Sequence, residues 1–155
     1  MKRATLSVLV VLGAALVFPV RSSRGQSPAA PGGEAVVGLA VRGAHRAYPA
    51  TLFSARRVVN DTVGGMEVAI FHDPAHGVSA AWFRMVRGEP IEFSGAAVGT
   101  VADDLTTATR WDLATGVAVG GNLQGQRLVS LPVSTTSRAH WTLEHPDTEI
   151  FSDNR

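Results

Sequence analysis

From Ala35 onward, short apolar segments alternate with turns that contain Gly, which is the pattern of an antiparallel sheet. Val63-Gly64-Gly65 favours a tight hairpin because Gly tolerates positive φ. The sequence therefore predicts a mainly β fold: a single antiparallel β-rich domain, barrel-like or sandwich-like, with one short C-terminal helix, or an α+β fold with a minor helix. The expected strands are residues 36–41, 46–48, 57–60, 66–71, 80–86, 91–93, 109–112, 117–119, 127–131 and 149–151. The clearest expected hairpin joins residues 80–86 to residues 91–93.

The late helix is expected to begin at Thr135 or Thr136, since Thr can cap a helix N-terminus. It should end near Glu144, because the residue before Pro146 disfavours helical geometry. The chain contains no Cys, so burial of a core must hold the fold without disulfides.

The first residues have the pattern of an export signal. Lys2 and Arg3 precede an apolar run over residues 4–20, and small and polar residues follow that run. These are the parts of a secretory signal, so we expect a cleaved signal peptide and a periplasmic or secreted protein. An uncleaved N-terminal anchor is the alternative, because the run is at the lower edge of bilayer-spanning length.

Three segments follow from this interpretation: a signal peptide (1–25), a flexible Pro/Gly/Ala linker (26–34) and the β-rich domain (35–155). Cleavage after Ala30 is the second option. No Cys follows the apolar run, which excludes a lipoprotein anchor. No membrane span is expected after signal cleavage.

The mature part is acidic although the whole chain has a formal charge of +1. Of the 14 basic residues, Lys2, Arg3, Arg21 and Arg24 precede Gln26, whereas all 13 acidic residues follow it, so the mature charge is 10 − 13 = −3. No basic stripe remains, which argues against a nucleic-acid partner.

Several segments, in order, resemble one family. They are Arg46-Ala47-Tyr48-Pro49, Val58-Val59-Asn60-Asp61-Thr62-Val63-Gly64-Gly65, Phe83-Arg84, Phe93-Ser94-Gly95, Asp104 with Thr107, Thr109 and Trp111, Gly116 with Gly120, Gly125 and Leu128, and Trp141 with His145-Pro146-Asp147-Thr148. The ordered set is similar to the domain-of-unknown-function family numbered 3179 and covers about residues 37–151. The resemblance implies an exported or envelope location and no particular reaction.

The chain departs from the family pattern in two places. Family members usually carry Cys-Pro-Leu-Cys or Cys-Pro-Leu-Thr after the Val-Gly-Gly hairpin, where this chain has Asp73-Pro74-Ala75-His76. The stretch between Gly95 and Trp111 is also shorter and lacks the usual Tyr-Asn-Ser-Asp run. A family chemistry based on cysteine could not proceed here in the same way. One hypothesis is therefore that this chain is a divergent member that kept the fold and lost the ancestral function.

The sharpest candidate site is the segment that contains His72, Asp73 and His76. Imidazole and carboxylate groups bind Cu²⁺ and Zn²⁺, and on a loop after a strand the three side chains could converge on one ion. The alternative is that Asp73-Pro74 makes a turn, with both imidazoles in solvent.

Other polar residues have a functional and a structural interpretation. Asp61 could be a general base or a ligand, but Asn60 and Asp61 are expected to bond the backbone of the following turn. Asp103 and Asp104 could hold a cation, although turn chemistry in a Thr-rich loop explains them equally.

Arg84 and Arg110 could clamp an anionic ligand or cover the outer face of the sheet. Trp111 is expected to fill a core or cleft. His140 and Glu144 are four residues apart, so an exposed ion pair on the helix is expected, with Trp141 packed inward.

The sequence thus predicts a non-catalytic extracytoplasmic module that binds a small ligand or an envelope protein. The alternative is a Cu- or Zn-binding envelope protein that uses His72, Asp73 and His76. No nucleophile elbow, phosphate-binding loop or dinucleotide fingerprint is present in the sequence.

Overall fold

The computed structural model describes residues 33–153, which form a mainly β fold with one short α-helix. This confirms the predicted fold class. The predicted signal peptide and residues 26–32 of the predicted linker lie outside the described residues. Within residues 33–153, no helix has the length and apolar character needed to cross a membrane.

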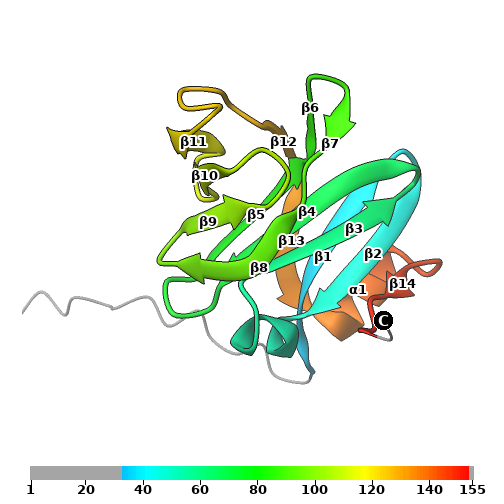
Figure 1. Ribbon diagram of the computed structural model, residues 1–155. Coiled ribbons are helices and arrows are strands. Elements are labelled where there is room, and N and C mark those ends of the chain that lie inside the picture. The colour runs from blue at the N-terminus through cyan, green and yellow to red at the C-terminus, as the bar shows by residue number, and fades with distance from the viewer. Residues whose placement is uncertain (1–32, 154–155) are drawn as a thin grey trace, which may run out of the picture.

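The strands form three four-stranded sheets and one small hairpin (Figure 1). In spatial order, the helix-side sheet contains β13 (Val133–Ser137), β1 (Ala35–Val41), β2 (Ala44–Pro49) and β14 (Glu149–Ile150). The central sheet contains β12 (Val129–Leu131), β5 (Val78–Phe83), β4 (Met66–Asp73) and β3 (Val58–Val63). The distal sheet contains β11 (Val117–Gly121), β10 (Thr109–Asp112), β9 (Val101–Asp104) and β8 (Phe93–Val98). The hairpin pairs β6 (Met85–Val86) with β7 (Glu89–Pro90), and the helices are the 3-10 helix η1 (Ala50–Ser54) and α1 (Arg138–Glu144).

The elements stack in layers that share three apolar cores. Trp141 of α1 packs on Val36 and Ala47 of the helix-side sheet. The other face of that sheet shares a core with the central sheet, and the central sheet shares a second core with the distal sheet. The arrangement is sandwich-like, and no sheet among the described strands closes into a barrel.

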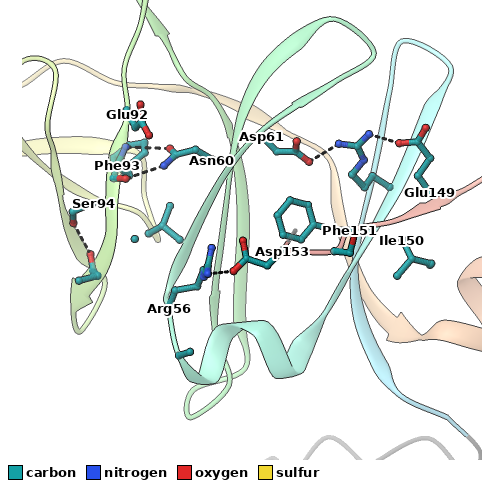
Figure 2. Close-up of a pocket in the computed structure, with 16 residues that line it drawn as sticks. Arg56, Asn60, Asp61, Glu92, Phe93, Ser94, Glu149, Ile150, Phe151 and Asp153 are labelled. Carbon is teal, nitrogen blue, oxygen red and sulfur yellow. Dashed lines mark hydrogen bonds and ion pairs between the residues drawn. The ribbon is translucent and has the colours of Figure 1, made fainter. Parts of the chain in front are cut away.

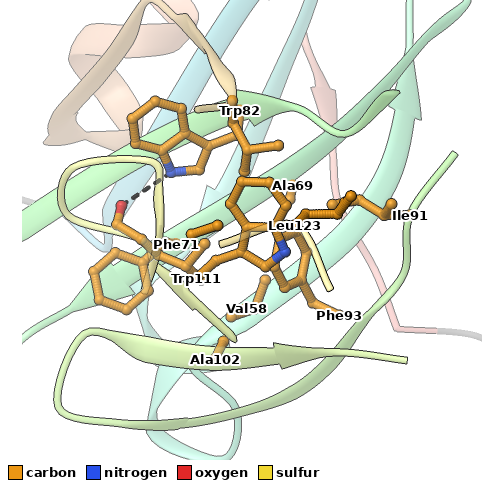
Figure 3. Packing of buried hydrophobic residues seen from close by; sticks show 12 residues of the cluster. Val58, Ala69, Phe71, Trp82, Ile91, Phe93, Ala102, Trp111 and Leu123 are labelled. Carbon is orange, nitrogen blue, oxygen red and sulfur yellow. Dashed lines mark hydrogen bonds between the residues drawn. The ribbon is translucent and has the colours of Figure 1, made fainter. Parts of the chain in front are cut away.

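The strand β4 is buried on both faces. Val68 and Ile70 lie in the core under the helix-side sheet, whereas Ala69 and Phe71 lie in the core under the distal sheet. Figure 3 shows Ala69 and Phe71 packed with Trp111 in this second core. Because successive side chains of a strand point to opposite faces, a strand between two cores must be apolar at every position, which explains the unbroken run Val68-Ala69-Ile70-Phe71.

Two strand predictions need correction. The expected hairpin between residues 80–86 and 91–93 forms only in part. Residues 80–83 belong to β5 and pair with β4 and β12, whereas β6 pairs with β7 and the Ile91 N–H donates to the Arg84 carbonyl at 2.8 Å. The turn between β6 and β7 is Arg87-Gly88, where both residues have positive φ. In addition, β4 extends to Asp73 rather than ending at residue 71, since its pairing with β5 continues to Val78. The strands β9 and β13 have no predicted counterpart because their segments are rich in polar residues.

The helix α1 begins later than expected. Thr135 and Thr136 belong to β13, and the N-cap is Ser137, whose hydroxyl accepts a hydrogen bond from the His140 N–H at 3.2 Å. Glu34, the last residue of the predicted linker, accepts a hydrogen bond from the Arg138 N–H at 2.8 Å. The start of β1 and the start of α1 are therefore tied together.

Gly38 of β1 leaves the space that the Trp141 ring occupies. A Cβ atom on Gly38 would lie 2.4 Å from Trp141 ring carbons, well inside van der Waals contact. We expect Gly38→Ala to lower the free energy of unfolding by about 1–3 kcal/mol, because α1 must move away from the sheet. Denaturant unfolding followed by Trp fluorescence measures the change.

Gly120→Ala is the matched control, since Gly120 also lies in a strand without positive φ. Its added Cβ would meet the end of the Arg110 side chain at 2.9 Å, and that flexible group can move. Equal losses in the two variants would contradict the role of Gly38.

Candidate functional site

An open groove of about 800 Å³ lies along the edge of the central sheet (Figure 2). Residues 92–96, which include the start of β8, form one wall, and residues 149–153, which include β14, form the other. Asn60 and Asp61 of β3 lie between the walls, and Val58 of the same strand also lines the groove. The groove is thus built where all three sheets meet.

Charged side chains lie at both ends of the groove. At one end, Arg46 of β2 donates to Asp61 Oδ2 at 2.7 Å and also pairs with Glu149. At the other end, Arg56 pairs with Asp153. Glu92 is exposed and has no ion-pair partner among residues 33–153. Carboxylates therefore outnumber guanidinium groups in the lining.

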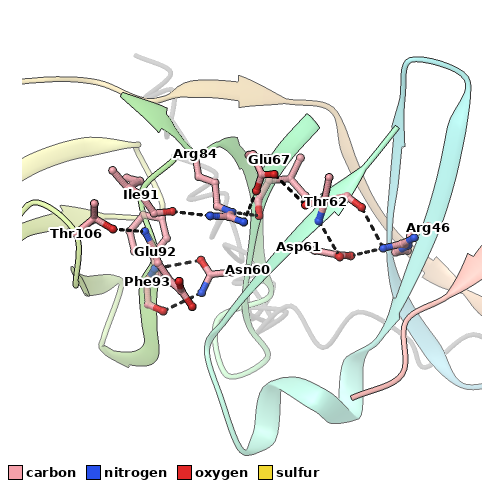
Figure 4. Close-up of polar contacts among 11 residues, drawn as sticks. Arg46, Asn60, Asp61, Thr62, Glu67, Arg84, Ile91, Glu92, Phe93 and Thr106 are labelled. Atoms are coloured by element: carbon pink, nitrogen blue, oxygen red, sulfur yellow. Dashed lines mark hydrogen bonds and ion pairs between the residues drawn. The ribbon is translucent and has the colours of Figure 1, made fainter. Parts of the chain in front are cut away.

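Asp61 is buried and fully engaged (Figure 4). Its Oδ2 accepts hydrogen bonds from the Tyr48 hydroxyl at 2.8 Å and from Arg46, and its Oδ1 accepts from the Thr62 N–H at 2.8 Å. Thr62 belongs to β3, so the expected bond from Asp61 to the backbone of the following turn does not form, and the two contacts to β2 were not predicted. Arg46 and Tyr48 are two apart on a strand and so share a face, which is the signal that could have indicated a common partner. Asp61 thus holds β2 against β3.

Asn60 has a different partner from the one expected. Its side-chain amide donates to the Phe93 carbonyl at 2.8 Å and accepts from the Phe93 N–H at 3.1 Å (Figure 4). The prediction that Asn60 bonds the backbone of the following turn is therefore wrong. The amide group instead pairs with a backbone residue of β8 and joins the central sheet to the distal sheet.

The three predicted metal ligands do not converge. His72 and Asp73 are successive residues of β4, so their side chains leave opposite faces of the sheet. The His72 ring lies edge-on to Phe53, with 5.3 Å between centroids, and its Nδ1 lies 2.8 Å from Ser79 Oγ. Burial lowers the pKa of His72. The expectation that both residues lie on a loop after the strand is wrong, because β4 continues through them.

Asp73 and His76 are the only members of the trio that meet. Asp73 Oδ2 lies 2.6 Å from His76 Nδ1, and Oδ1 accepts from Arg57 at 2.7 Å and from the Ala75 N–H at 3.0 Å. The hydrogen bond with His76, together with the bonds from Ala75 and Arg57, lowers the pKa of Asp73. Asp73 thus closes the β4–β5 turn, as the structural alternative predicted, but that alternative is wrong in placing both imidazoles in solvent, because His72 is buried. Within residues 33–153, no group of three or more His, Cys, Asp and Glu side chains is arranged to hold an ion. Binding of Cu²⁺ or Zn²⁺ by all three side chains would require β4 to separate from its neighbours.

Arg84 is committed to the protein itself. Its guanidinium donates to the carbonyls of Val68 at 3.2 Å and Ile91 at 2.8 Å, and it pairs with Glu67 (Figure 4). These contacts hold the chain that leaves the central sheet. The guanidinium N–H groups of Arg84 are therefore engaged within the protein and do not form a clamp for an anionic ligand.

Asp103 and Asp104 also point to opposite faces, because both lie in β9 rather than in a loop. Asp103 is exposed, whereas Asp104 is buried and accepts from the N–H groups of Thr106 at 2.7 Å and Thr107 at 2.9 Å. Asp104 Oδ2 also accepts from the Trp111 indole N–H at 3.2 Å. The turn chemistry of Asp104 is confirmed, and the acid pair does not form a joint site.

Trp111 is fully buried in the core between the central and distal sheets, as expected (Figure 3). His140 Nε2 lies 3.5 Å from Glu144 Oε1 on the surface of α1, which confirms the predicted pair. None of Trp111, His140 and Glu144 lines the groove. Of the candidate residues, only Asn60 and Asp61 line the groove.

The remaining lining residues were not found from the sequence. Arg46, Glu92, Glu149 and Asp153 come from separate segments, and β14 joins the sheet by parallel pairing with β2. Sequence spacing carries no information about such a meeting of distant segments.

Comparison with known proteins decides the family. The model of the family described as "protein of unknown function (DUF3179)" matches residues 15–155. The chain belongs to the DUF3179 family. This confirms the resemblance, and the match extends beyond residues 37–151 at both ends. No curated protein and no solved structure matches the chain.

The Tyr48–Asp61 contact predicts an alkaline effect on this DUF3179 protein. Burial raises the pKa of Tyr48 far above its ordinary value, and the Asp61 carboxylate adds to the increase. In the unfolded chain, Tyr48 should ionise at about pH 10. The unfolded chain then binds fewer protons than the folded one, so stability should fall as the pH rises above that value.

Tyr48 is the only tyrosine, so tyrosinate absorbance reports on this one group. We expect the absorbance to appear together with unfolding and not before it. Tyr48→Phe should show a shallower loss of stability at alkaline pH. Reversible ionisation of Tyr48 near its ordinary pKa in a folded chain would contradict the burial argument.

Proposed function

We propose that this DUF3179 protein is a non-catalytic, exported module that binds a ligand or partner in the groove beside β3. The proposal of export rests on the positive start, apolar run and small-residue exit of residues 1–25. The proposal of binding rests on the groove.

The groove itself is the observation that carries the binding proposal. Its volume of about 800 Å³ falls in the range of ligand sites. Its walls are strands and segments held by backbone pairing and by ion pairs, so the shape exists before anything binds. Binding sites are usually more apolar than this lining. The excess of charged and polar groups therefore indicates a polar ligand or a polypeptide.

The engagement of the candidate acids and bases supports binding rather than catalysis. Asp61 already accepts three hydrogen bonds, and Asp73 is held by Arg57, Ala75 and His76. A general base must reach the proton of its substrate with an oxygen that is not already engaged. Both oxygens of Asp61 already accept hydrogen bonds from the protein, and Asp73 does not line the groove.

Site-specific photo-crosslinking in the producing cells tests the proposal. The full chain would carry a photoreactive amino acid at Ala96, which is exposed and lines the groove. The matched control places it at Val98, two residues along the same strand, which is 88% exposed and does not line the groove. We expect an adduct at Ala96 and none at Val98.

Fractionation of the same cells tests export. The intact mass of protein from the periplasm or medium should correspond to a chain that begins at Gln26, or at Pro31 if cleavage follows Ala30. Full-length protein retained in the cytoplasm would contradict export. Equal adducts at Ala96 and Val98, or none at either, would contradict binding in the groove.

A further inference from the structure

We propose that the groove takes an extended polypeptide segment with basic side chains, which adds to the free edge of β3 as a further strand. This inference rests on the proposed function and names the class of its partner. It follows from the backbone of β3, from the position of β8 and from the charges of the lining.

The strand register shows which backbone groups face the groove. The His72 N–H donates to the Arg57 carbonyl at 3.2 Å, so this pair is hydrogen-bonded across β3 and β4. In an antiparallel ladder such pairs alternate, and the register continues them at Val59, Asp61 and Val63. The backbone N–H and C=O groups of Val58, Asn60 and Thr62 therefore point to the other edge of β3, toward the groove.

The backbone groups at both ends of the free edge of β3 are hydrogen-bonded, whereas those in the middle are not. At one end, the Thr62 N–H bonds Asp61 Oδ1, and the Thr62 carbonyl accepts from Arg46 at 3.3 Å. At the other end, the Arg57 N–H donates to the Gly95 carbonyl at 2.8 Å. Between these contacts, the backbone N–H and C=O of Asn60 have no partner among the described residues.

The neighbouring strand β8 does not close this gap. Its Gly95 carbonyl accepts from Arg57, the residue before β3, but at Phe93 the Asn60 side chain makes the connection that a paired backbone would otherwise make. The register of β8 also shifts between Phe93 and Ala97. The two strands thus diverge along β3, and Asn60 lines the groove where they diverge (Figure 2). An unpaired strand edge beside a groove is the geometry that accepts an added strand.

The charges of the lining select the side chains of that strand. Asp61, Glu92, Glu149 and Asp153 face Arg46 and Arg56, and both arginines are already paired. The lining therefore has an excess negative charge of two, and Glu92 is exposed without an ion partner in residues 33–153. Complementary charge favours Lys or Arg in the added segment.

A blocked peptide of alternating Lys and Val tests the inference with the isotope-labelled mature chain. The expected result is that the largest amide NMR shift change falls at Asn60 and its neighbours in β3. The same peptide with N-methyl groups on alternate residues should bind about tenfold more weakly or worse, because it loses backbone donors. A Glu-Val peptide of equal length should also bind more weakly.

Two variants locate the binding on the protein. Ala96→Trp fills the groove and should abolish binding of the Lys-Val peptide, whereas Val98→Trp should not change it. Equal binding of the N-methylated peptide, or no binding of the Lys-Val peptide, would overturn strand addition. If crosslinking at Ala96 succeeds while the peptide does not bind, the groove remains a binding site and only the proposed strand addition fails.

Discussion

The structure depends on a central sheet that is buried on both faces. Without disulfides, each outer layer must be held by the core it shares with this sheet, and β4 contributes a side chain to one core or the other at successive positions. Polar groups in such a strand are tolerated only at its end, where His72 and Asp73 find partners in Ser79, Arg57 and His76. The layered arrangement therefore follows from one short apolar segment, and α1 closes the stack through Trp141.

The edge strand β3 joins the layers by polar contacts where the cores end. Because adjacent side chains alternate, Asp61 reaches Tyr48 and Arg46 of the helix-side sheet, and Asn60 reaches Phe93 of the distal sheet. The Asn60 side chain bonds the backbone N–H and C=O of Phe93, which a neighbouring strand backbone would otherwise bond. The central and distal sheets are thus linked without becoming one continuous sheet. The groove is the space left by this divergence. Structure and proposed binding site thus have a common origin in one strand of a DUF3179 protein.

The sequence was sufficient for the fold class, for most strands and for the buried roles of Trp111 and Trp141, because these depend on local apolar patterns. It misled wherever polar residues stood side by side. Three pairs of adjacent polar residues suggested joint sites: Asn60-Asp61, His72-Asp73 and Asp103-Asp104. Each pair lies in a strand, so the two side chains of the pair point to opposite faces. Two adjacent polar residues can share a site when they lie on a loop. On a strand they point to opposite faces, so adjacency there argues against a shared site. The groove could not be predicted, because its walls come from β8 and from the parallel strand β14, and no local pattern encodes that meeting.

The Asn60 side chain fixes the start of β8, and with it one wall of the groove, against β3. Amide hydrogen exchange in Asn60→Ala tests it most directly, with Thr62→Ala, an exposed position on the same face of β3, as the control. We expect amides of β8 and β9 to lose protection by about tenfold or more, since the paired hydrogen bonds to Phe93 are removed, while β1 and β2 keep theirs. Unchanged protection of β8, or an equal loss in every sheet, would contradict it.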